Sequence, residues 1–148
     1  MATTLRSRTA LVLAAALLPT SVSATAALAG PAVAATAAAP VTLYATLSPS
    51  GDSNGRGSAT VRLNRQTQRV CATLDWSRIG RPNAAHIHRK SDGGIVVDLT
   101  NAIGDGSGCT TGVGKRIIRR IVEHPRRYYV NVHNRAYPAG AIQGTTHR

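Results

Sequence analysis

Phenylalanine is absent from this 148-residue chain, and other aromatic residues are few, with four Tyr and one Trp. Any hydrophobic core must therefore be built from Val, Ile, Leu and Ala. Acidic residues are also scarce, since six Asp and Glu stand against 18 Lys and Arg and the net charge is +12. The length excludes a barrel enzyme of about 250 residues and any large two-domain protein.

The motifs of common catalytic sites are missing too. The sequence has no G-x-S-x-G, no H-E-x-x-H, no phosphate-cradling glycine loop and no pair of carboxylates close together. Asp75 and Ser77 flank Trp76, and we expect them to cap a turn rather than to catalyse a reaction. We therefore expect no enzymatic activity, no catalytic residue and no site for an organic cofactor.

Long apolar runs are absent as well. The run Ala10–Leu18 is too short for a transmembrane helix, which needs about 20 apolar residues. Arginines precede this run, and small-residue A-x-A triplets follow at Ala27–Ala29 and Ala32–Ala34, which is the pattern of a secretory signal. We predict a signal peptide over residues 1–34 and an Ala-rich flexible tail over residues 35–40. The protein is then secreted and extracellular, with no transmembrane segment after processing.

The remaining sequence alternates apolar and polar residues with a period of two. Such alternation, bounded by Gly, Ser, Asn and Asp clusters, is typical of half-buried antiparallel strands. Lys115–His124 differs because its Ile and Val residues have helical spacing, and Pro125 is expected to end that helix. We predict an all-β, antiparallel, immunoglobulin-like β-sandwich of about seven strands with one short helix. The predicted strands are Val41–Leu47, Ser58–Asn64, Arg69–Trp76, Ala84–Arg89, Ile95–Thr100, Tyr128–His133 and Ala139–Gly144.

The alternation also assigns faces and one turn. In the strand that begins at Tyr128, we expect Tyr128, Val130 and Val132 to face the core, and the residues between them to share the opposite face. Pro138–Gly140 is expected to form the turn into the last strand, because Pro fixes one dihedral angle and Gly can adopt a positive φ.

Only two cysteines are present, Cys71 and Cys109. Both lie in the part of the chain that we expect to be exported, where disulfides form and persist. They allow a single intramolecular pairing, and we predict a disulfide between them. Two free thiols or a metal-binding pair are the alternatives, although a C-x-x-C spacing is absent.

Several segments resemble the CHRD domain, the repeat named after chordin, in the form found in secreted bacterial proteins. They are the segments AHIHR at Ala85–Arg89, IVVDL at Ile95–Leu99, YYVNVHNRAYPAGAIQG at Tyr128–Gly144, and the cysteine-bearing RVCATLDW and GSGCTTGVG. The resemblance implies an immunoglobulin-like sandwich, in agreement with the strand pattern, and we place a CHRD-like domain at residues 41–146. It implies an extracellular module more than any activity.

Three histidines form the candidate site. His86 and His88 lie two residues apart in one predicted strand, so their side chains share a face, and His133 ends another strand away from its apolar residues. Three imidazoles can bind copper or zinc with a place left for water. The alternative is a structural role, in which the rings hold strands together through hydrogen bonds to the backbone or to Asp98.

The surplus of arginine predicts anionic partners. Basic residues are concentrated around the short helix, at Arg116, Arg119, Arg120, Arg126 and Arg127. This charge favours an anionic cell-envelope polymer, whereas the scarcity of aromatic side chains argues against specific nucleic-acid binding.

Other basic residues bear on the histidines. Arg89, Lys90 and Arg135 lie close to them in sequence and are expected to repel a divalent cation, which Asp92 and Asp98 offset in part.

Taken together, these features predict a secreted, non-catalytic binding or structural module of the CHRD family. Its extracellular ligand is unknown, and it is expected to associate with the anionic cell envelope. The alternative is a copper- or zinc-binding protein that uses His86, His88 and His133, for which redox activity is a remote prospect.

Overall fold

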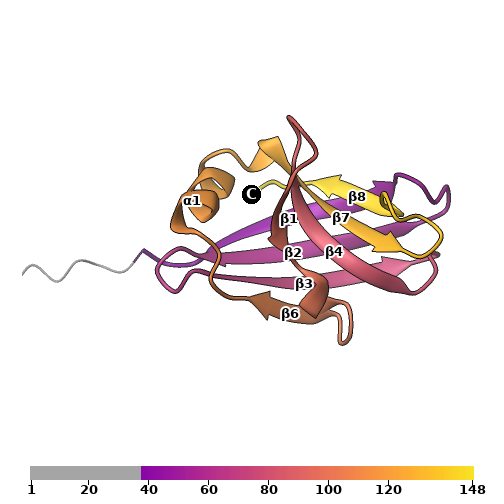
Figure 1. Cartoon of the computed structure of the whole chain (residues 1–148), viewed down its shortest axis with the longest axis horizontal. Coiled ribbons are helices and arrows are strands. Elements are labelled where there is room, and N and C mark those ends of the chain that lie inside the picture. Colours follow the sequence, from indigo (N-terminus) through magenta and orange to yellow (C-terminus); the bar gives the residue numbers. More distant parts are fainter. Residues whose placement is uncertain (1–37) are drawn as a thin grey trace, which may run out of the picture. The chain divides into compact units, whose positions relative to one another are not determined.

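The period-two segments form antiparallel strands in the computed structural model, which describes residues 38–148 (Figure 1). The predicted signal peptide and the first residues of the predicted Ala-rich tail lie outside the described residues. The strands are β1 Val41–Pro49, β2 Arg56–Asn64, β3 Arg69–Ser77, β4 Pro82–Arg89, β5 Ile95–Asp98, β6 Ser107–Thr110, β7 Tyr128–Asn134 and β8 Ile142–Thr145, and the helices are η1 Thr100–Ala102, α1 Lys115–Glu123 and η2 Pro125–Arg127.

The strands are joined in one sheet, in the order β5-β4-β7-β8-β1-β2-β3-β6. The end of β1 joins the two halves of this sheet, because Ser48 and Pro49 pair with Gln143 and Ile142 of β8. In Figure 1, β4 and β7 cross over β1, β2 and β3, so that the sheet curls nearly into a barrel. The two halves enclose a core of Val, Ile, Leu and Ala side chains, together with Tyr128, as the composition required.

The all-β antiparallel class and the single α-helix are confirmed, but the seven-strand sandwich is not. The described residues form eight strands, and these belong to one continuous sheet rather than to two separate sheets. The strand that the sequence did not reveal is β6, in a glycine-rich segment. At Gly108 a Cβ atom would stand 2.7 Å from the backbone N of Ala102, and closer still to the carbonyl of Asn101. Glycine is therefore required there by the close approach of two backbones. Because a glycine has no side chain, it adds nothing to the apolar–polar alternation from which the other strands were predicted.

A disulfide joins Cys71 of β3 to Cys109 of β6, as predicted. The two residues are direct partners in the β3–β6 ladder, so the covalent bond and the strand pairing support each other.

The predicted strand that starts at Ile95 is shortened for a local reason. Asp98 Oδ1 accepts a hydrogen bond of 2.8 Å from the backbone N–H of Thr100, and such a side-chain bond turns the chain out of the ladder into η1.

The face assignment in β7 is confirmed. Tyr128, Val130 and Val132 are all buried in the core. The predicted turn before β8 is also present, because the N–H of Gly140 donates to the carbonyl of Tyr137 at 3.0 Å and Gly140 has a φ of +132°. In α1 the apolar spacing buries Ile118 and Ile121 against the same core.

Candidate metal centre

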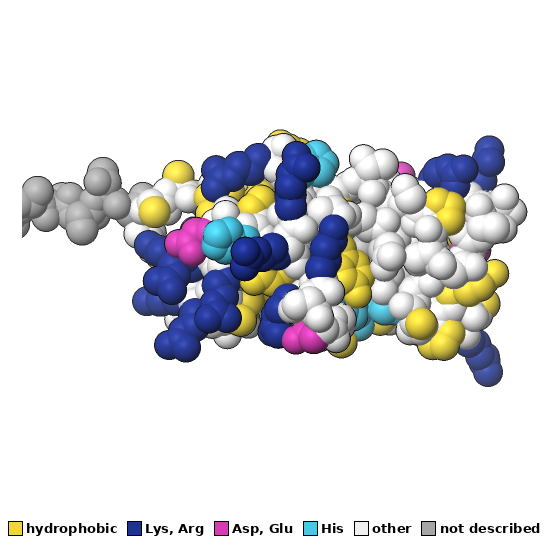
Figure 2. Space-filling model, turned by 90° about the horizontal axis from the view of Figure 1, so that it is seen from above, with side chains coloured by type: hydrophobic (Ala, Val, Ile, Leu, Met, Phe, Trp, Pro, Cys, Tyr) yellow, Lys and Arg dark blue, Asp and Glu magenta, His cyan; other side chains and the backbone are white. Residues whose placement is uncertain are grey.

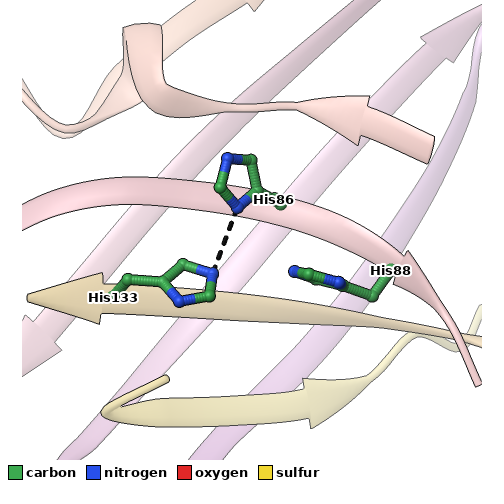
Figure 3. Close-up of side chains that lie close together, drawn as sticks. All are labelled: His86, His88 and His133. Atoms are coloured by element: carbon green, nitrogen blue, oxygen red, sulfur yellow. Dashed lines mark hydrogen bonds between the residues drawn. The ribbon is translucent and has the colours of Figure 1, made fainter. Parts of the chain in front are cut away.

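The three candidate histidines come from two neighbouring strands. In β4, Ala85 and Ile87 are buried in the core, so the alternation of side chains places His86 and His88 on the opposite face. β7 lies beside β4, and its residue His133 pairs with Ala84, one step from His86 on the same face. The structure therefore brings together all three residues that the sequence singled out (Figure 3).

The rings are close enough to share one ion. One nitrogen from each of His86, His88 and His133 lies within 4.8 Å of the other two. His86 Nδ1 and His133 Nε2 are the nearest of these atoms, 3.1 Å apart, and the dashed line in Figure 3 joins them. The ring of His88 also lies near both others, with centroid distances of 5.5 Å to His86 and 5.7 Å to His133.

Backbone carbonyls fix the protonation of two of the rings. His88 Nδ1 lies 2.8 Å from the carbonyl of Gly93, and His133 Nδ1 lies 3.0 Å from the carbonyl of Pro138. Since a carbonyl can only accept, both Nδ1 atoms carry hydrogen and both Nε2 atoms present lone pairs when the rings are neutral. His88 Nε2 is buried and has no hydrogen-bond partner among the described residues.

The ring of His86 lies between a carboxylate and His133. Its Nε2 lies 3.9 Å from Asp98 Oδ1, while its Nδ1 faces His133. With hydrogen on Nδ1, His86 donates to His133 Nε2. With hydrogen on Nε2, it faces the Asp98 carboxylate and leaves the Nδ1 lone pair pointing into the trio. A single change of tautomer thus converts the hydrogen bond between His86 and His133 into two unprotonated nitrogens whose lone pairs can bind a metal ion.

The environment favours the neutral form of His86 and of His133. Burial lowers the pKa of both His86 and His133, and the neighbouring histidines lower these pKa values further. For His86 the nearby Asp98 opposes this effect, and for His133 the hydrogen bond to Pro138 does so. The pKa of Asp98 itself is lowered by its hydrogen bonds from Thr100. Neutral rings beside an ionised carboxylate are a favourable setting for a cation, because no proton has to be displaced first.

None of the basic side chains that were expected to repel a divalent cation lines the site. The trio lines a hollow of about 410 Å³ together with Asn83, Ala84, Ile95, Pro138 and Ala139, and no Lys or Arg is among the residues that line it. Arg89 instead forms an ion pair with Asp92. Arg89, Lys90 and Arg135 are thus near the histidines in sequence but do not line the hollow that they share.

Supporting residues were missed by sequence reasoning. The ring of Tyr129 stacks on His88, with centroids 5.1 Å apart and an interplanar angle of 16°. Its place on the same face of β7 as His133 was visible in the alternation, but its ring partner depends on the pairing of Tyr129 with His88 across the ladder. The sequence could not single out the carbonyls of Gly93 and Pro138 as partners of the histidines, because every residue carries a backbone carbonyl.

A family model, the CHRD domain, matches residues 24–146, which is most of the chain. No curated protein and no solved structure matches the chain. CHRD domains are non-enzymatic extracellular modules, and the Cys71–Cys109 disulfide fits that setting. In residues 38–148, no helix is long and apolar enough to cross a membrane. From the match over most of its length, the chain belongs to the CHRD domain family.

Proposed function

We propose that this CHRD domain is an extracellular, non-catalytic module that binds copper or zinc on His86, His88 and His133. The observation that carries this proposal is the orientation of the three rings. Each ring turns one nitrogen toward the trio and the other outward: His88 and His133 form hydrogen bonds with the carbonyls of Gly93 and Pro138, and His86 faces the Asp98 carboxylate at 3.9 Å. Metal-binding histidines are almost always oriented in this way, because the outer hydrogen bond fixes the tautomer and makes the inner nitrogen a better ligand.

The distances are compatible with one small ion. With metal–nitrogen bonds of 2.0–2.1 Å, two ligands of a tetrahedral ion stand about 3.3 Å apart. The 3.1 Å between His86 Nδ1 and His133 Nε2 is close to that value. Since all three nitrogens lie within 4.8 Å of one another, His88 then has to approach the other two by at most about 1.5 Å. The hollow in front of the trio leaves room for water as a fourth ligand, and three neutral nitrogens suit Cu²⁺ and Zn²⁺, with Cu²⁺ bound more tightly.

The structural alternative explains less of the site. Hydrogen bonds from His88 to Gly93 and from His133 to Pro138 do hold neighbouring turns. A purely structural role, however, does not account for His88 Nε2, which is buried without a hydrogen-bond partner among the described residues. An orphaned buried acceptor costs about 1–3 kcal/mol, and a metal ion would remove that cost.

We also propose that residues 1–34 direct export and that the mature protein associates with the anionic cell envelope. The signal-like pattern at the N-terminus supports export, and the basic character of the mature chain supports the association: of the 18 Lys and Arg residues, only Arg6 and Arg8 are removed with residues 1–34, which contain no acidic residue. Mass spectrometry of the protein recovered from the culture medium tests export. Cleavage near Ala34 is the expected result, and an intact Met1 on the secreted protein would contradict it.

The metal site is tested by calorimetric titration of chelator-stripped protein without an affinity tag, near neutral pH. Wild type is expected to bind one Cu²⁺ with a Kd below about 10 μM, and Zn²⁺ more weakly. The double variant His86→Ala/His88→Ala should lose this binding, while His124→Ala, which removes an exposed histidine elsewhere, should keep it. Electron paramagnetic resonance of the Cu²⁺ form should show nitrogen ligands. Binding that survives in the double variant would refute the site.

A further inference from the structure

A basic cleft lies at the end of the domain that carries α1. Six cationic side chains line it, from three segments that are distant in sequence: the end of β4 and the turn after it, α1, and η2. The cleft has a volume of about 720 Å³. Figure 2 shows Lys and Arg side chains gathered at this end of the molecule. The six cationic residues are Arg89, Lys90, Arg119, Arg120, Arg126 and Arg127.

Backbone hydrogen bonds hold the three segments in place. The N–H of Lys90 donates to the carbonyl of Arg127 at 2.9 Å, which joins the turn after β4 to η2. The N–H of Arg127 donates to the carbonyl of His124 at 3.0 Å, which joins η2 to the end of α1. The buried Thr146 donates from Oγ1 to the carbonyl of Pro125 at 2.6 Å. The positive charges are therefore gathered by a rigid framework rather than by flexible side chains alone.

Their charge is poorly neutralised within the protein. Glu123 is the single carboxylate that lines the cleft, and it lies 3.8 Å from Arg119. Arg89 is paired with Asp92. The other four basic side chains, Lys90, Arg120, Arg126 and Arg127, form no ion pair with any described residue. Like charges that line one cleft repel one another, and an anionic ligand with several charges would relieve that repulsion.

The side chains indicate the chemistry of the ligand. Five of the six cations are arginines, whose planar guanidinium groups match the oxygen geometry of phosphate and bind it through paired hydrogen bonds. Two rings line the cleft: Tyr128 is only 5% exposed, and His124 is the single exposed one. The cleft therefore lacks the series of exposed aromatic rings on which successive nucleic-acid bases stack. The cleft thus suits a chain of phosphate groups without bases.

We infer that this cleft binds a linear, phosphate-bearing polymer, with Arg120, Arg126 and Arg127 as its main contacts. The inference rests on the proposed association with the anionic envelope and gives that association a defined surface. It is independent of the histidine trio, whose hollow shares no residue with the cleft.

The test measures binding of linear inorganic polyphosphate by calorimetry, at low and at high salt. The triple variant Arg120→Ala/Arg126→Ala/Arg127→Ala is compared with the control Arg62→Ala/Arg81→Ala/Arg135→Ala. The control removes the same charge from exposed residues that do not line the cleft. We expect the cleft variant to raise the Kd at least about tenfold and the control to change it less than about threefold. Both variants should keep the wild-type melting temperature and Cu²⁺ affinity.

Equal weakening in the two variants would overturn the cleft as the binding surface, while general attraction to anionic polymers would stand. If wild type binds no polyphosphate even at low salt, both the cleft and the envelope association fail. Tighter binding of single-stranded DNA with the same number of phosphates would overturn the assignment to a base-free polymer. Loss of Cu²⁺ binding in the His86→Ala/His88→Ala variant, with polyphosphate binding unchanged, would separate the two sites.

Discussion

Gly140 connects the stability of the fold to the geometry of the histidine trio. Its φ of +132° is a conformation that only glycine adopts without strain. A Cβ atom at this position would stand 2.8 Å from Asn131 Cγ, and closer still to the amide oxygen and nitrogen of that buried side chain. Asn131 in turn donates from Nδ2 to the carbonyl of Ala139 at 3.0 Å, within the same turn that offers Pro138 to His133.

Replacing Gly140 by alanine is therefore expected to act in two ways. The backbone conformation costs about 1–3 kcal/mol for a residue with a Cβ atom. Displacing Asn131 from its hydrogen bond costs about 1 kcal/mol more. We expect Gly140→Ala to lower the free energy of unfolding by about 2–4 kcal/mol, measured by urea denaturation. If the turn shifts, the carbonyl of Pro138 no longer orients His133, and Cu²⁺ affinity should fall about tenfold or more.

Two other glycines provide matched controls. Gly112 has a φ of +73° and open space where a Cβ would be, so Gly112→Ala isolates the backbone strain, at about 1 kcal/mol. Gly104 has open space and no positive φ, and Gly104→Ala should stay within about 0.5 kcal/mol of wild type. Neither control should change Cu²⁺ affinity. A Gly140→Ala protein as stable as Gly112→Ala would refute the packing of this turn against Asn131.

Three further predictions follow from the fold and the pKa values. Replacing Cys71 and Cys109 together by serine opens a loop with a sequence separation of 38, and urea denaturation should show a loss of about 4 kcal/mol; an unchanged midpoint would mean that β6 is held by other contacts. Because the pKa values of His86 and His133 are below 6.5 in the folded state, the unfolded state binds more protons as the pH falls. The metal-free protein should therefore lose stability as the pH drops through 6.5 toward the folded pKa values, and His86→Gln/His133→Gln should weaken this dependence. Val130→Asp places a charge in the core and should abolish cooperative unfolding, whereas a stable, folded variant would show that β7 faces the other way.

The local patterns of the sequence were sufficient for most of the fold. Period-two alternation located seven of the eight strands, because side chains on a strand point to opposite faces in turn. The spacing of Ile117, Ile118 and Ile121 located α1 for the same kind of reason. β6 was missed because Gly108 is a glycine for a tertiary reason: the backbone of Asn101 in η1 leaves no room for a Cβ atom there. The alternation of residues within a strand gives no sign of that contact.

The candidate site divides in a similar way. That His86 and His88 share a face, and that His133 lies away from the apolar side of β7, followed from alternation within single strands. Which strand lies beside which, and in what register, followed from no local pattern. The pairing of β4 with β7 is the reason that His133 reaches His86 at 3.1 Å rather than lying elsewhere on the sheet.

The charges around the trio were decided by tertiary structure alone. Arg89 is the neighbour of His88 in sequence, but successive residues of a strand point to opposite faces, and Arg89 pairs with Asp92 outside the hollow. The acceptors that fix the histidine tautomers are the carbonyls of Gly93 and Pro138, which lie in turns after β4 and β7. The residue types that can bind a metal are thus present in the linear sequence. The direction of each lone pair depends on turns and strand register, because these set where a backbone carbonyl meets a ring nitrogen.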